Sequence, residues 1–323
     1  MRTQLLALAL VLAADAAGPA RMEFREEAAF AAPETAAPIG EVAGVACDAL
    51  GRVWATDAVG HRLVRWDGQG RWLDESGALG SDINQFRRPT SLTRLGLLGV
   101  AVLDAENRRV VVFDHQARRA DHVFALDDPG LERETGHITP IAISADRGGA
   151  LYVADSDRDR ILAFDFAGQY RRTIGGYGLS PGSFHGLVAL AVAPRGELVT
   201  LERAVPASRR GKAARPDSAG SGLAARVQWL DPGGMPLANW SLPGVAGTVA
   251  AIAVDDSGRV AVALEGPEGG EVWLHARDGA LLARLRGVRS PRSLAFASDG
   301  ALLVAESDAG RVRRFRLTPP RGK

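Results

Sequence analysis

One short unit recurs six times along this chain, and the repetition limits its possible folds more than any other feature. Each copy has an apolar stretch, a glycine turn and a second apolar stretch that ends in an acidic residue. The pattern Arg-aliphatic-x-x-aromatic follows, and Val45–Asp67 is the clearest example. The recurrent acids are Asp57, Asp104, Asp155, Glu202, Glu265 and Glu306. Their period is about 40 to 50 residues, apart from one longer interval, and this period is typical of propeller blades.

The repeat predicts an all-β fold, a six-bladed β-propeller with four-stranded antiparallel blades. A solenoid of helix pairs would need an apolar period of about 3.6 residues, which is not found. The expected blades cover residues 41–77, 89–127, 139–176, 187–242, 249–287 and 291–317. The last blade lacks a fourth strand, so we expect residues 21–30 to pair with it and close the ring. Closure would hide sheet edges that promote aggregation; the alternative is a disordered N-terminal tail.

The first 17 residues have the pattern of a secretory signal peptide. Arg2 precedes the apolar run Leu5–Ala14, and Ala14-Asp15-Ala16 offers small residues for cleavage. The run is shorter than the roughly 20 residues that span a bilayer, and no later segment is a transmembrane candidate. We therefore expect residues 18–323 to form an exported propeller, periplasmic or extracellular. An apolar tail on a cytosolic protein is the alternative.

Charge and cysteine content restrict the possible functions. The net charge of +1 provides no bulk field for nucleic acid or a membrane surface. Cys47 is the single cysteine, which excludes an intramolecular disulfide and a cysteine-based zinc site.

The stretch Leu151–Ile161, followed by Gly168 and by residues 175–184, resembles the NHL repeat. Residues 57–89 are similar. The resemblance implies a six-bladed propeller, a fold that hosts lyases, lactonases and binding scaffolds, so it does not imply one function.

In four copies the acid precedes an arginine by five positions, across a tight turn. These pairs are Asp57 with Arg62, Asp104 with Arg109, Asp155 with Arg160, and Glu306 with Arg311. We expect each pair to join adjacent strands of one hairpin, a structural role because it is repeated. The fifth copy deviates, because Glu271 replaces the arginine and Glu265 lies one position late.

Propeller enzymes of this type place metal ligands where the first strand of each blade begins. Resemblance to the peptidyl-hydroxyglycine lyase would place histidines eight residues before each turn glycine or, in the less regular second copy, just after Pro89. This chain has Ala43, Thr90, Ile141, Val188, Ala250 and Arg292 there. The gluconolactonase-like family uses Glu, Asn and Asp, but Asn84, Asn107 and Asn239 lie away from the strand starts.

His137 and His185 lie in loops near the same mouth, but surface histidines without a partner are the more common case. We therefore predict no catalytic residue, metal ligand or cofactor. A divalent-metal-dependent hydrolase or lyase is the alternative.

Loops on a rigid scaffold are the usual place for recognition, and two groups of loops share the channel mouth. One is the basic insertion 203–225, which carries Arg209, Arg210 and Lys212. The other is the pair of inter-blade loops, in which we single out Phe86, Arg87, Arg88, Tyr177, Phe184 and His185.

Together with Thr90 and Arg292 at the strand starts, these residues predict a binding scaffold, which we expect to be a monomer. We expect it to bind an unidentified protein or acidic ligand through its loop face. RNA binding is disfavoured by the export signal. The alternatives are a solvated insertion with no partner and a structural assembly protein of the envelope.

Overall fold

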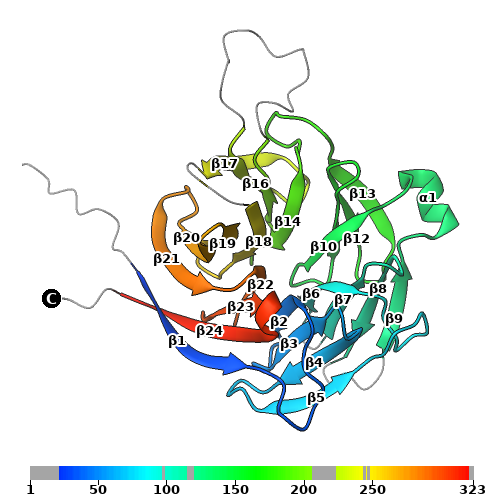
Figure 1. The fold of residues 1–323 in the computed structure, drawn as a ribbon. Helices are drawn as coiled ribbons and strands as arrows, with labels where there is room; N and C mark the ends of the chain where they lie inside the picture. The colour runs from blue at the N-terminus through cyan, green and yellow to red at the C-terminus, as the bar shows by residue number, and fades with distance from the viewer. Residues whose placement is uncertain are drawn as a thin grey trace, which may run out of the picture.

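The computed structural model describes residues 22–96, 99–114, 120–205, 223–242, 245 and 248–319. It contains six four-stranded antiparallel sheets arranged around a central axis (Figure 1). This confirms the six-bladed propeller.

The first three sheets are consecutive along the chain. Their strands are β2 (Val42–Cys47), β3 (Val53–Asp57), β4 (Arg62–Trp66), β5 (Trp72–Ser76), β6 (Pro89–Leu95), β7 (Gly99–Asp104), β8 (Arg109–Phe113), β9 (Ala120–Ala125), β10 (Pro140–Ala145), β11 (Leu151–Asp155), β12 (Arg160–Phe164) and β13 (Tyr170–Gly175). The helix α1 (Pro129–Thr135) lies between the second and third sheets. No helix in these described ranges is long and apolar enough to cross a membrane.

The other three sheets continue the ring. Their strands are β14 (Leu187–Val192), β15 (Leu198–Glu202), β16 (Ala225–Leu230), β17 (Pro236–Leu242), β18 (Thr248–Val254), β19 (Val260–Gly266), β20 (Gly269–His275), β21 (Leu281–Val288), β22 (Pro291–Phe296), β23 (Leu302–Glu306), β24 (Arg311–Thr318) and β1 (Glu23–Phe30).

The N-terminal strand closes the ring, as expected. β1 pairs with β24 along its length, from Glu23 opposite Thr318 to Phe30 opposite Val312. Phe30 is fully buried and its ring meets the Trp66 ring edge-on at 6.0 Å. Pairing therefore covers the outer edge of β24 and ties the sixth blade to the first.

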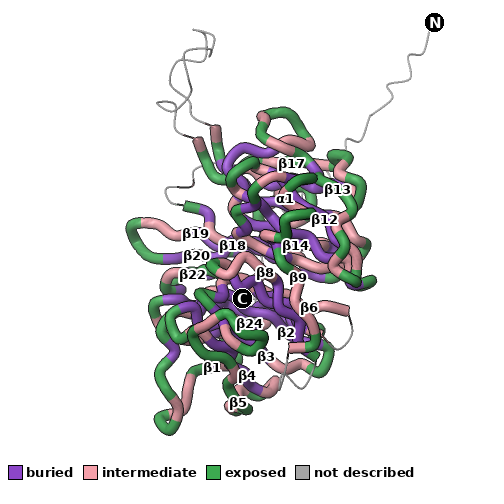
Figure 2. The backbone as a smooth tube through the Cα atoms, turned by 90° about the vertical axis from the view of Figure 1, so that its right-hand side faces the viewer, coloured by how far each residue is buried: buried purple, intermediate pink, exposed green. Residues whose placement is uncertain are grey.

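Burial follows strand position within each blade. Every residue of the second strands β3, β11, β15 and β23 is buried, whereas the outer strand β5 is mostly exposed. Figure 2 shows buried backbone in the interior of the molecule and exposed backbone in its peripheral loops. Central strands are covered on both faces by neighbouring blades, so they have continuous apolar runs instead of alternation.

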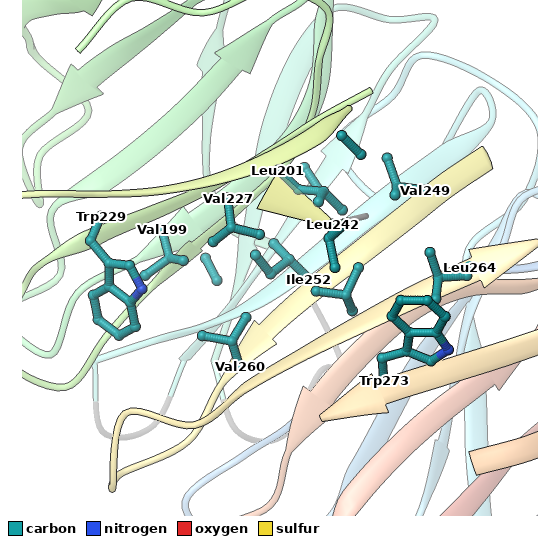
Figure 3. Close-up of a cluster of buried hydrophobic side chains, with 14 of the residues drawn as sticks. Val199, Leu201, Val227, Trp229, Leu242, Val249, Ile252, Val260, Leu264 and Trp273 are labelled. Atoms are coloured by element: carbon teal, nitrogen blue, oxygen red, sulfur yellow. The ribbon is translucent and has the colours of Figure 1, made fainter. Parts of the chain in front are cut away.

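The hydrophobic core is divided into wedges between adjacent blades. In one wedge Val199, Val227 and Trp229 of blade four face Ile252 and Val260 of blade five (Figure 3). Each blade buries apolar surface only against its neighbours, as in other repeat proteins.

Two equivalent inter-blade loops are anchored by phenylalanine. Phe86 and Phe184 are fully buried, and each packs where a glycine leaves space, at Gly77 and Gly175. Both glycines have positive φ, and a β-carbon at Gly175 would lie 2.2 Å from the Phe184 ring. A side chain is therefore excluded there both by conformation and by space.

Candidate functional site

Strand direction assigns the loops to two faces. Because strands alternate, the loops between second and third strands share one face with the segments between blades. We call this the mouth face. The opposite face, which carries the loops between first and second and between third and fourth strands, is the turn face.

The mouth face is held together by the repeated acids. In five blades the acid contacts an arginine at the first or second position of the third strand. The nearest nitrogen–oxygen distances are 3.0 Å for Arg62 and Asp57, 2.8 Å for Arg109 and Asp104, 2.8 Å for Arg160 and Asp155, 2.6 Å for Arg226 and Glu202, and 2.6 Å for Arg311 and Glu306. All five carboxylates are fully buried. A buried carboxylate needs such partners, since an isolated charge in the interior is costly.

The same acids also hold the segment that enters each blade. Asp57 accepts hydrogen bonds from the backbone N–H groups of Gly40 and Glu41, and Asp155 accepts one from Thr139. The arginines complete the connection, because Arg62 donates to the carbonyl oxygens of Ala37 and Pro38. Each acid–arginine pair thus joins a hairpin to the preceding inter-blade segment, and we call this arrangement a staple.

The staple of blade four has extra members. Burial opposes ionisation of Glu202, but contacts with His185, Arg226 and Gln228 hold the pKa of its carboxyl below the ordinary value. His185 is buried, with its Nδ1 2.9 Å from Glu202 Oε2. Its Nε2 has no hydrogen-bond partner among the described residues.

Blade five has no staple. Leu264 occupies the register position of the acid, opposite Val249, and faces Glu271 where the other blades have arginine. Glu265 is therefore displaced by one position, opposite Gly270, and its carboxylate pairs with no arginine among the described residues of its own blade.

Instead, Glu265 reaches the entrance of blade six. Its Oε1 accepts a hydrogen bond from the Ser290 hydroxyl at 3.1 Å, and its Oε2 lies 3.5 Å from Arg292. Ser290 Oγ is also 2.5 Å from Asp308 Oδ2. Sequence reasoning noted the displaced acid and missed this polar cluster, since the contacts join separate blades.

The predicted binding residues fall into three groups. Phe86, Phe184 and His185 are buried, so they present no side-chain surface to a partner, contrary to what their loop positions suggested. Hydrophobic anchoring of the loops explains the two phenylalanines. Arg209, Arg210 and Lys212 lie outside the described residues, as do residues 1–17 of the expected signal peptide.

The third group reaches the surface of the mouth face. Tyr177 is 79% exposed. Arg88 is exposed and lies 3.3 Å from Glu41, while Arg292 has its longer contact with Glu265. Arg87 is exposed, whereas Thr90 is half-buried.

Two further arginines lie on this face: Arg203, the first residue of the predicted basic insertion, and Arg289, which was not predicted. Arg203 and Arg289 are exposed, like Arg87. Within the described part of the chain, none of these three guanidinium groups forms an ion pair. The sequence offered one signal for these arginines. Arg203 directly follows the staple acid Glu202, and Arg87 and Arg289 lie in the inter-blade segments that the staple acids Asp104 and Glu306 hold.

The described residues contain no group of three or more His, Cys, Asp or Glu side chains arranged to hold a metal ion. His137 contacts Arg108 and Glu132, whereas His185 lies beside Glu202. Burial raises the pKa of the Cys47 thiol to about 11, so it is protonated at neutral pH and is a poor nucleophile.

A cavity of about 480 Å³ follows the central axis between the innermost strands. Ile141, Val188, Ala250 and Arg292, four of the six strand-start residues, line it. Three of these four side chains, Ile141, Val188 and Ala250, are apolar, and Arg292 is charged.

No protein-family model matches this chain, and no curated protein matches it significantly. Solved structures with a similar fold include a streptogramin B lyase, with a TM-score of 0.57 and 13% identity over 92% of this chain and 98% of that one. A virginiamycin B lyase from Staphylococcus aureus has a TM-score of 0.62 and 11% identity over 92% of this chain and all of that one. At such low identity, these likenesses show the propeller fold alone.

Proposed function

We propose that this protein is an exported, non-catalytic propeller scaffold that binds an acidic protein segment through its mouth face. The observation that carries the proposal is the set Arg87, Arg203 and Arg289. These exposed guanidinium groups have no carboxylate partner among the described residues. Arginine forms paired hydrogen bonds with carboxylates and is enriched at interfaces.

The three arginines belong to alternate blades. Arg87 precedes blade two, Arg289 precedes blade six, and Arg203 follows β15 of blade four. Their spread around the axis suits a long acidic segment better than a small anion. The exposed Tyr177 would add an aromatic contact on the same face.

A rigid support strengthens this interpretation. The staples hold the inter-blade segments against the hairpins, so the loops require little ordering when a partner binds. Pre-organisation of this kind reduces the entropic cost of association. The proposal also includes the NHL-type repeat and the export signal. The mass of the mature chain after secretion tests whether the export signal is cleaved.

The direct test uses poly-L-glutamate and the full-length protein. A triple variant, Arg87→Gln, Arg203→Gln and Arg289→Gln, should lose most of the affinity, and wild-type binding should weaken with added salt. The matched control is Arg71→Gln, Arg171→Gln and Arg195→Gln, which removes three positive charges from the turn face. Equal binding by both triple variants would contradict the proposal, as would a preference for polygalacturonate, an acidic glycan.

A second candidate is a divalent-metal-dependent lyase or hydrolase. Its support is the fold likeness to two lyases, together with the carboxylates Glu265 and Asp308, which both contact Ser290 on the mouth face. Elemental analysis of the purified protein tests it. Stoichiometric calcium, zinc or magnesium that is lost in Glu265→Gln would favour this candidate over the scaffold.

A further inference from the structure

The central cavity has a second end, on the turn face, whose residues differ from those of the mouth. Its walls are built by the six innermost strands, each in contact with its two neighbours around the axis. Many wall residues are small or aliphatic, among them Ala142, Val192 and Ala253. A volume of about 480 Å³ lies within the range of small-molecule sites.

Charged residues gather at the turn-face end. Arg147 Nη2 lies 3.0 Å from Asp256 Oδ1, although the two residues are 109 positions apart and belong to blades three and five. These blades are not neighbours, and both residues line the cavity. The ion pair therefore crosses the end of the channel.

This crossing contact is weak. The side chains of Arg147 and Asp256 are 62% and 76% exposed. Ion pairs with such exposure contribute little, because water and salt screen them. The pair can open at small cost and leave Arg147 available to another anion.

Arg94 lines the same cavity from blade two and is half-buried. No carboxylate among the described residues forms an ion pair with it. The other nearby acids are engaged in their own turns: Asp146 accepts the Ala150 N–H at 2.9 Å, and Asp255 contacts Arg259 at 2.5 Å. Arg94 is thus a cation without a counter-ion among the described residues, beside a cavity with many small and aliphatic side chains in its walls.

We infer that the turn-face end of the cavity binds a small amphipathic carboxylate. Arg94 receives the carboxylate, Arg147 joins it when the contact with Asp256 opens, and the apolar body occupies the cavity. The inference is independent of the mouth-face proposal, because it uses the opposite face and different arginines.

The experiment measures affinity by ligand-observed NMR titration of the full-length protein. The probe is 2-naphthoate, with 2-naphthylmethanol as the neutral analogue and inorganic phosphate as an anion without an apolar body. Arg94→Gln should weaken 2-naphthoate binding by about tenfold or more. Asp256→Asn should strengthen it by about two- to fivefold, because Arg147 no longer has a competing partner.

The control is Arg195→Gln, which removes an arginine of the turn face that does not line the cavity, and it should bind like the wild type. Thermal melting of each variant separates lost binding from lost folding. Unchanged affinity in a folded Arg94→Gln variant would overturn the inference. Binding of 2-naphthylmethanol as tight as that of 2-naphthoate would overturn it as well, because the carboxylate would then contribute nothing. Phosphate binding as tight as that of 2-naphthoate would also overturn it, because the apolar body would then have no place in the cavity.

Discussion

Leu264 faces Glu271 in blade five, at the register position where the other five blades pair a buried carboxylate with arginine. Leu264 is buried, and Glu271 instead accepts a hydrogen bond from Trp273 Nε1 at 2.6 Å and lies 3.1 Å from Arg286. The break in the repeat removes one staple and leaves Glu265 free to reach the next blade.

Rebuilding this staple gives a double-mutant cycle. Leu264→Asp alone should destabilise the protein by about 3 kcal/mol or more, since it buries a carboxylate opposite Glu271. Adding Glu271→Arg should recover part of the loss, with a favourable coupling of about 0.5–3 kcal/mol. Chemical denaturation of the four proteins measures the coupling, and strictly additive effects would show that blade five cannot form the pair.

The existing staples should be far stronger than surface ion pairs. Asp155→Ala leaves Arg160 buried without its counter-ion and should reduce the free energy of unfolding by about 3–5 kcal/mol. Asp256→Ala removes an exposed carboxylate and should cost about 0–1 kcal/mol. If thermal melting gives the same small shift for both, the stabilising role of the staple is wrong.

The inter-blade loop of residues 175–184 contains one residue that anchors the loop, the buried Phe184, and one that is exposed for a partner, Tyr177. Phe184→Ala should cost about 3–5 kcal/mol, because a fully buried ring leaves a cavity. Tyr177→Ala, in the same loop, should change stability by less than about 0.5 kcal/mol. Denaturant midpoints test the contrast, which would fail if the two variants were equally stable.

Ring closure should control the oligomeric state. Deletion of Glu23–Phe30 exposes the edge of β24 and removes the buried Phe30, so the protein should melt at a lower temperature and aggregate. Glu23→Gln, an exposed change in the same strand, is the control. Light scattering after size-exclusion chromatography reports the mass, and a monomeric deletion variant with an unchanged melting temperature would refute the role of β1.

His275 should make stability depend on pH. Burial lowers the pKa of His275 below its ordinary 6.5, although the Gly279 carbonyl favours the protonated ring. The unfolded chain then binds the proton more readily, so this contribution is complete above about pH 6.5 and is lost as the pH falls toward the folded-state pKa.

His275→Phe introduces the aromatic type that Phe113 and Phe164 provide at the same position in other blades. The variant should lose less stability than the wild type between about pH 6.5 and 5. Denaturation at several pH values measures the difference, and parallel curves would exclude His275 as the cause.

Much of the fold follows from the order of residues along the chain. The blade count is readable because each blade repeats a local pattern, in which the turn glycines and the acid–arginine spacing of five lie within one hairpin. Closure by Glu23–Phe30 is also predictable, since the sixth repeat lacks a strand and an unpaired edge is unfavourable.

The candidate site depended on contacts that no local pattern records. Burial of Phe86 and Phe184 depends on the space beside Gly77 and Gly175. The replacement of the staple acid by Leu264 depends on the register of the sheet in blade five. The contact between Arg147 and Asp256 joins blades that meet only around the axis. Local hydrogen bonds and apolar periodicity specify each blade, whereas the two proposed binding sites are formed when side chains from distant repeats converge.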